Sequence, residues 1–189
     1  MRALEARYLG KLGLRLVARY GRIGEERCAY EPGIPWEALD RIGFRARETE
    51  LERAGVNVVV QTGQWPHPRL DHLGIVGDER ALGELLRRAE RRGLATQPLA
   101  GGRRTSVATG AGLRLEVALG EEDADGPALA ELHLRTDAPA ARARALASLL
   151  GTKADGARLE VGGTLLRFVA GGPRGRPELW AERFAGAAP

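Results

Sequence analysis

The sequence predicts an α+β protein in which one unit, a strand followed by a helix and three further strands (βαβββ), occurs twice in tandem. The first observation behind this prediction is that residues 69–120 contain, in this order, the hydrophobic patterns of one strand, one helix and three strands. The second is that the same order restarts over residues 128–172, so the chain contains an internal repeat. Residues 1–66 precede the repeat and are rich in strand patterns, and residues 173–189 follow it as a C-terminal tail.

The first unit opens with an apolar strand over residues 70–76. Asp78 is then a candidate N-cap for a helix over residues 79–92, in which apolar side chains recur at helical spacing. Gly93 follows as a candidate C-cap. Three short strands complete the unit, at residues 94–99, 104–109 and 113–119, with glycine turns at 101–102 and 110–112.

The second unit follows an acidic linker at residues 121–127 and repeats the order in a shorter form. A strand is predicted over residues 129–136 and a helix over residues 140–150, with Pro139 in the first turn, where proline is tolerated. Residues 152–155, where the next strand would lie, have no strand character. The last two strands are predicted to form a hairpin across a Gly-Gly turn, at residues 158–161 and 164–170.

Residues 1–66 are interpreted as a partial or divergent βαβββ-like module. Residues 8–14 resemble the end of the module helix as it enters the next strand, which would leave the module without its first strand. Strands are predicted at residues 14–20, 27–30, 42–46 and 56–61, and short helices at residues 4–10 and 48–54.

The charge pattern argues against nucleic acid as a partner. The net charge is +4, but only two of the 29 basic residues are lysines, Lys11 and Lys153, and the arginines are interspersed with acidic residues. Aromatic residues make up only 5% of the chain. Nucleic-acid binders gather their basic residues on one element and interleave aromatic ones, so we expect no nucleic-acid partner.

The chain is also expected to be a cytoplasmic protein that does not enter a membrane. No apolar run approaches the roughly 20 residues that a membrane-spanning helix needs. Residues 1–10 are charged and contain no apolar signal core. The single cysteine, Cys28, cannot form an internal disulfide, which agrees with a reducing compartment.

Several segments of the repeat resemble modules of the vicinal oxygen chelate superfamily, which includes glyoxalases, extradiol dioxygenases and bleomycin-resistance proteins. The run RLDHLGIV at residues 69–76 resembles the first strand of such a module, and residues 104–109 and 112–117 resemble its last two strands. The run ELHLR at residues 131–135 resembles the first strand of the partner module. The resemblance implies a curved mixed sheet with a central cup. Because such modules often pair between chains, it also implies a homodimer.

Metal-dependent members of this superfamily hold a divalent ion in the cup between paired modules. Carried over by position, the resemblance assigns three ligands here, namely His72, Glu116 and His133. The fourth ligand is expected near Phe168, where the sequence has neither an acid nor a histidine, so a glyoxalase-type site with four protein ligands is in doubt. Two imidazoles and one carboxylate suit Fe, Mn, Ni or Zn.

The residues themselves leave two interpretations of these side chains open. His72 and His133 occupy equivalent positions in the two repeats, as expected of paired ligands, yet a histidine on a strand is often structural. Glu116 is predicted on the opposite face from its apolar neighbours, and a strand carboxylate is often a surface charge. Glu160 lies in a second copy of the tetrapeptide RLEV and is interpreted as a surface charge, with a ligand or base as the alternative. His67 is interpreted as a linker residue.

Two functions follow as expectations. The first is a divalent-metal-dependent lyase, isomerase or dioxygenase acting on a small oxygenated substrate, with His72, Glu116 and His133 as ligands and no catalytic residue assigned. The alternative is a metal-free ligand-binding or sequestering protein of the bleomycin-resistance type. The paired histidines favour the first, and the missing fourth ligand favours the second.

Overall fold

The computed structural model describes residues 1–53, 56–63, 68–99, 104–120 and 129–185. These residues form three four-stranded sheets and four helices, with no closed barrel among them, and the predicted mixed α/β class is confirmed. The chain divides into two compact units. Unit 1 comprises residues 1–64 and 184–189, and unit 2 comprises residues 65–183.

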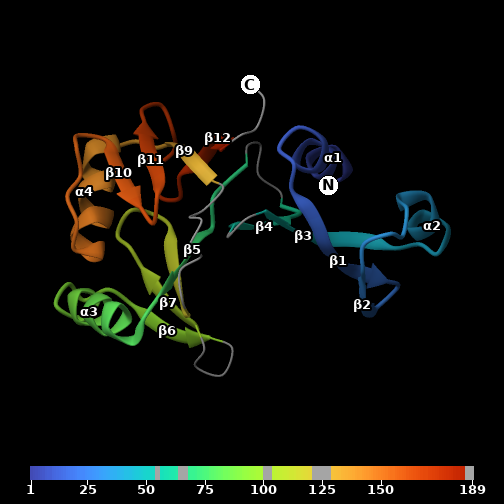
Figure 1. Cartoon of the computed structure of the whole chain (residues 1–189), viewed down its shortest axis with the longest axis horizontal. Coiled ribbons are helices and arrows are strands. Elements are labelled where there is room, and N and C mark those ends of the chain that lie inside the picture. The colour runs from blue at the N-terminus through green and yellow to red at the C-terminus, as the bar shows by residue number, and fades with distance from the viewer. Residues whose placement is uncertain (54–55, 64–67, 100–103, 121–128, 186–189) are drawn as a thin grey trace. The chain divides into compact units, whose positions relative to one another are not determined.

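Unit 1 has one antiparallel sheet with two helices (Figure 1). The sheet order is β2-β1-β3-β4 and each pairing is antiparallel. Its core contains apolar side chains from both helices and from the strands, among them Tyr8, Leu16, Leu39 and Leu51. The elements are α1 (Arg2–Gly10), β1 (Arg15–Ile23), β2 (Glu26–Tyr30), α2 (Trp36–Arg41), β3 (Arg45–Arg53) and β4 (Val56–Gln61).

The short helix expected at residues 48–54 is wrong, because residues 45–53 form strand β3 and Ala54 lies outside the described residues. The run Glu-Thr-Glu-Leu-Glu has a period of two, which places Thr49 and Leu51 in the interior. Its glutamates bind side chains of neighbouring strands, since Tyr20 and Asn57 both donate to Glu50. These cross-strand contacts outweigh the helix propensity of glutamate.

The first sheet of unit 2 has the predicted βαβββ order. Its strand order is β5-β8-β7-β6, with β5 parallel to β8. Asp78 caps the helix as predicted, because its side chain accepts a hydrogen bond of 2.6 Å from the backbone N–H of Ala81. The elements are β5 (His72–Gly77), α3 (Glu79–Glu90), β6 (Thr96–Leu99), β7 (Arg104–Ala108) and β8 (Arg114–Leu119).

The second sheet repeats this order without its second strand, as the sequence predicts. Residues 152–157 contain no strand, only an isolated bridge between Asp155 and Arg158. Strand β9 is parallel to β11, and the sheet order is β10-β11-β9-β12. The elements are β9 (Leu129–Arg135), α4 (Pro139–Leu150), β10 (Arg158–Val161), β11 (Thr164–Val169) and β12 (Glu178–Phe184).

Residues 173–189 were expected to be a C-terminal tail, but residues 178–184 form strand β12 of the second sheet. Arg69 pairs with Glu178 in an antiparallel bridge, and the N–H of Leu179 donates to the carbonyl of Pro68. Strand β12 therefore lies between β9 and the residues that lead into β5. Backbone partners on both sides keep this short segment extended.

Helices α3 and α4 lie on the same side of the strands of unit 2 (Figure 1). Leu85 and Ala89 of α3 pack in one core cluster with Leu115 and Val117 of β8. Helix α4 packs through Ala143, Leu146 and Ala147 on Leu132, Leu134, Leu166 and Phe168. The alternate residues of the same strands face away from both helices, and we call this surface the helix-free face.

None of the described helices is both long enough and apolar enough to span a membrane. The acidic linker at 121–127, the Gly101-Gly102 turn and His67 lie outside the described residues.

Candidate functional site

His72 and Glu116 lie together on the helix-free face of the first sheet. His72 pairs with Arg114 across the parallel β5–β8 ladder, and Glu116 pairs with Gly74, two residues further along. This register brings the Nε2 atom of His72 within 3.8 Å of the Oε2 atom of Glu116. A methyl group built on Gly74 would meet no atom within 4 Å, so the space beside this pair is open. The structure therefore brings two of the three predicted ligands together.

Asp71 anchors the other side of the His72 ring. Its Oδ2 atom is 3.5 Å from the Nδ1 atom of His72, and its carboxylate is also bound by Arg114 and Arg176. Burial alone would raise the pKa of Asp71, but the hydrogen bond from Arg114 and the charge of Arg176 outweigh it and lower this pKa. Asp71 therefore remains an anion that orients the imidazole.

His133 contacts a different carboxylate, on its own strand. Its Nε2 atom lies 2.9 Å from the Oε2 atom of Glu131, and the other oxygen of Glu131 binds Arg183 at 2.6 Å and Arg167 at 3.5 Å. The hydrogen bond with His133, followed by that from Arg183, lowers the pKa of Glu131 to about 2. The predicted ligand His133 is thus a member of a four-residue ionic cluster.

This low pKa predicts an acid-dependent loss of stability. Glu131 stays charged in the folded chain down to about pH 2, whereas its ordinary pKa is 4.5. The cluster therefore stabilises the fold above pH 4.5, and this contribution is lost as the pH falls from 4.5 towards 2. Denaturant unfolding between pH 2 and 6 should show a smaller acid-side loss for Glu131→Gln than for the wild type.

The matched control is Glu160→Gln, because Glu160 is an exposed glutamate on β10 of the same sheet. This variant should lose stability with acid as the wild type does. Equal acid profiles for Glu131→Gln and the wild type would contradict the assignment.

The contacts of β12 show how far apart the two histidines lie. Arg135 contacts Glu178 at 4.0 Å, and Glu178 pairs with Arg69. These three residues therefore lie side by side, at the same position along their three neighbouring segments. His133 precedes Arg135 by two residues and His72 follows Arg69 by three.

The direction of the segments decides whether the two-residue offset of His133 from Arg135 and the three-residue offset of His72 from Arg69 add or cancel. Contacts of Arg135 with Glu178 and of Glu131 with Arg183 show that β9 and β12 run in opposite directions. The residues leading into β5 are also antiparallel to β12, so they run in the same direction as β9. The offsets therefore add to about five residues, or roughly 16 Å along the strands.

His133 is placed several residues along the strands from the pair formed by His72 and Glu116. Donor atoms about 2.0–2.2 Å from one ion must lie within about 4 Å of one another. Among the described residues, no group of three or more His, Cys, Asp or Glu side chains is arranged to hold a metal ion. The three-ligand site stays a prediction, of which the structure brings only the His72–Glu116 pair together.

The structure adds a residue pair that the sequence analysis did not assign. Trp180 is 61% exposed, the highest exposure of the large hydrophobic side chains in the described part of the chain. The guanidinium of Arg135 lies 4.5 Å from its ring centroid. Arg135 follows His133 by two residues on β9, so the indole ring lies on the helix-free face, beside the ionic cluster. The alternation that indicates a strand is weak in Leu179–Phe184, which hid this placement.

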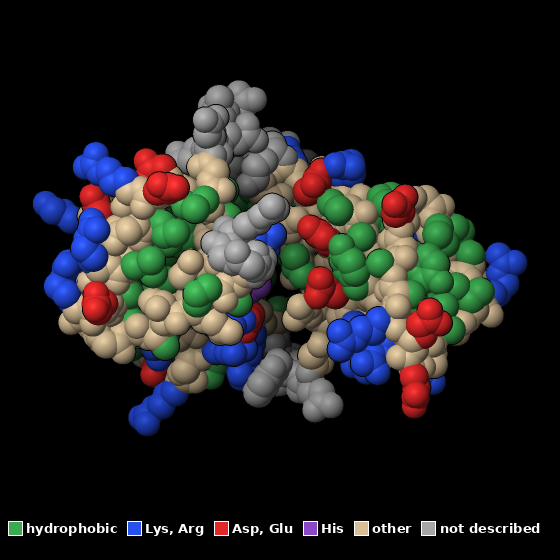
Figure 2. Space-filling model, turned by 90° about the horizontal axis from the view of Figure 1, so that it is seen from below, with side chains coloured by type: hydrophobic (Ala, Val, Ile, Leu, Met, Phe, Trp, Pro, Cys, Tyr) green, Lys and Arg blue, Asp and Glu red, His purple; other side chains and the backbone are tan. Residues whose placement is uncertain are grey.

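Acidic, basic and apolar side chains are interspersed on the face of the molecule in Figure 2. The predicted absence of a nucleic-acid partner stays a prediction.

Comparisons of the chain with protein-family models, curated proteins and solved structures give no match.

Proposed function

We propose that this chain is a ligand-binding protein of the vicinal oxygen chelate kind that holds a planar small molecule without a metal. The ligand would stack on Trp180 at the helix-free face of the second sheet. The observation that carries this proposal is the 61% exposure of a tryptophan whose ring contacts an arginine. Tryptophan is enriched at binding interfaces, because its ring offers a large apolar surface together with a polar N–H group.

The surroundings of Trp180 supply both apolar contact and orientation. Arg135 covers one face of the ring, which leaves the other face available for stacking. Glu131, His133 and Arg167 form a polar row beside it, on the paired positions of β9 and β11. A planar ligand with a polar substituent would be stacked by the indole and oriented by this row.

Titration calorimetry with 2-naphthoate and its neutral analogue 2-naphthol tests the proposal. Trp180→Ala should weaken binding of both probes by about tenfold or more, because stacking on an aromatic side chain contributes roughly 1–3 kcal/mol. Trp180→Phe should retain most of the affinity. The exposed position makes both substitutions nearly neutral for folding.

Leu119→Ala is the matched control, since Leu119 is another exposed apolar side chain of unit 2, at 43% exposure. It should leave binding unchanged. Equal affinities of wild type and Trp180→Ala for both probes would overturn the proposal, as would a wild type that binds neither.

A second candidate function is the metal-dependent lyase, isomerase or dioxygenase. The separation of 3.8 Å between His72 Nε2 and Glu116 Oε2 favours it, because these two atoms lie near enough for one divalent ion of Fe, Mn, Ni or Zn. Metal content of protein purified without chelator, for wild type, His72→Ala and His133→Ala, separates the two functions. One equivalent in the wild type that His72→Ala loses supports the metal enzyme and overturns the metal-free proposal, and its loss from His133→Ala as well would support the three-ligand site.

A further inference from the structure

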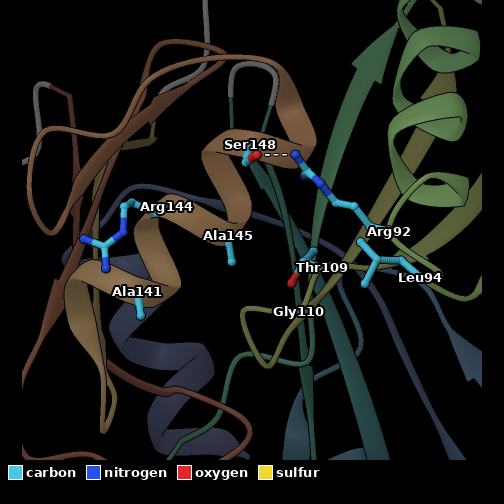
Figure 3. Close-up of a pocket in the computed structure, with 8 residues that line it drawn as sticks. All are labelled: Arg92, Leu94, Thr109, Gly110, Ala141, Arg144, Ala145 and Ser148. Carbon is cyan, nitrogen blue, oxygen red and sulfur yellow. Dashed lines mark hydrogen bonds between the residues drawn. The ribbon is translucent and has the colours of Figure 1, made fainter.

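A hollow of about 420 Å³ lies in unit 2 on the helix side, away from the helix-free face (Figure 3). One wall is the chain that follows α3, with Arg92 and Leu94, and the turn after β7, with Thr109 and Gly110. The opposite wall is a stripe of α4 that includes Arg144, Ala145 and Ser148. The two repeats therefore contribute one wall each.

The polar groups of this hollow are cationic or neutral. None of the described residues that line it is acidic. Arg92 reaches across the hollow and donates a hydrogen bond to the hydroxyl of Ser148, as Figure 3 shows. Within the described part of the chain, neither Arg92 nor Arg144 forms an ion pair with a carboxylate. The two guanidinium groups therefore give the hollow a positive charge that no carboxylate of the described residues pairs with.

The hydroxyl of Thr109 is already committed within its own turn. It donates to the carbonyl of Leu113 at 2.7 Å and accepts from the N–H of Ala111 at 3.0 Å. Thr109 thus shapes the wall, whereas Ser148 accepts from Arg92 and keeps its own hydroxyl proton for another acceptor.

The remaining wall is apolar. Leu94 faces Ala145 across the hollow in Figure 3, and Ala141 lies one turn before Ala145 on α4. Small side chains on α4 leave the volume open, and this volume falls within the range of about 300–1,000 Å³ that is usual for small-molecule sites. A ligand here would meet hydrocarbon on one side and a guanidinium on the other.

We propose that this hollow binds a small organic oxyanion, a carboxylate or a phosphate monoester, that carries a short apolar body. The fork of Arg92 donates two parallel hydrogen bonds to the oxyanion, and the Ser148 hydroxyl donates a third. The apolar body lies against Leu94 and Ala145. In Figure 3 the guanidinium of Arg144 is turned away from Arg92, and this exposed side chain can change rotamer to approach a bound anion.

Four probes distinguish the parts of this proposal in titration calorimetry. Benzoate and phenyl phosphate carry both the anion and the apolar body, whereas inorganic phosphate lacks the body and benzyl alcohol lacks the charge. At least one of the first two should bind more tightly than both of the last two, and which one binds identifies the oxyanion. Inorganic phosphate or benzyl alcohol binding as tightly as both full probes would overturn the proposal.

Variants then locate the binding. Arg92→Gln should weaken binding of the tighter probe about tenfold, because it removes hydrogen bonds from a charged donor at an exposed position. The matched control is Arg87→Gln, an exposed arginine of α3 outside the hollow, which should leave affinity unchanged. Equal affinities in these two variants would contradict the site.

Ala145→Leu should also weaken binding, because it fills the hollow, and its thermal unfolding checks that α4 remains folded. The loss of affinity caused by Arg92→Gln should be the same when Trp180 is also replaced by alanine, because Trp180 lies on the helix-free face and outside the hollow. The anion site and the proposed stacking site can thus fail separately.

Discussion

Replacement of Glu5 by alanine is expected to lower the free energy of unfolding of unit 1 by about 3–5 kcal/mol. The Glu5 carboxylate accepts two hydrogen bonds from Arg19, of 2.9 Å from Nε and 2.6 Å from Nη2. The side chains of this pair are only 4% and 7% exposed. The indole N–H of Trp36 donates a third bond to Glu5, at 3.1 Å. Removing the carboxylate would leave a buried guanidinium without its counter-charge.

Denaturant unfolding followed by circular dichroism and by tryptophan fluorescence measures this loss. The matched control is Asp40→Ala, which breaks the exposed pair of Asp40 with Arg2 and should change stability by at most about 1 kcal/mol. The double variant Glu5→Leu with Arg19→Met removes both charges and should recover part of the loss. A Glu5→Ala variant no less stable than Asp40→Ala would show that the buried pair does not stabilise unit 1.

Gly112→Ala is expected to destabilise unit 2 by about 2–5 kcal/mol, for two reasons that add. Gly112 has a φ of +84°, which costs a residue with a Cβ atom roughly 1–2 kcal/mol. A Cβ atom there would also collide with the carbonyl oxygen of Gly175, and crowding of this kind costs roughly 1–3 kcal/mol. The obstacle is backbone, which cannot move aside by changing a rotamer.

Gly162→Ala separates these two causes. Gly162 also has a positive φ, of +52°, but a Cβ atom there would meet nothing within 4 Å. It should therefore show only the conformational cost of about 1–2 kcal/mol. Thermal and denaturant unfolding of the two variants measures the difference. If Gly112→Ala costs no more than Gly162→Ala, the close approach of the turn after β7 to the segment before β12 is not rigid.

Local patterns were sufficient for most elements of unit 2. The spacing of Leu82, Leu85, Leu86 and Ala89, with the Asp78 cap, identifies α3 because both signals depend only on neighbours within a few residues. The same holds for the face of Glu116, which the alternation with Leu115 and Val117 places opposite the core. The side of the sheet on which Glu116 lies was therefore predictable from the sequence.

Strand β3 was predictable in principle from the same kind of signal. Its alternating Glu-Thr-Glu-Leu-Glu run is a strand pattern, but the helix propensity of glutamate favours the wrong interpretation. The partners that settle it, Arg15 for Glu52 and Gln61 for Glu48, come from strands 37 and 13 residues away. Cross-strand pairing therefore overrode local propensity.

The neighbours of each strand were decided only by the tertiary structure. Residues 178–184 carry no pattern that names β9 as their partner, because the backbone donors and acceptors of an open strand edge are the same for every sequence. With β12 beside β9, Arg183 binds Glu131 and Trp180 packs on Arg135. The same pairing places His133 several residues away from His72 along the strand direction. Periodicity along the chain determines which face a side chain occupies. Which faces meet depends on pairing between residues far apart in the chain, and this pairing set the histidines apart and exposed the tryptophan.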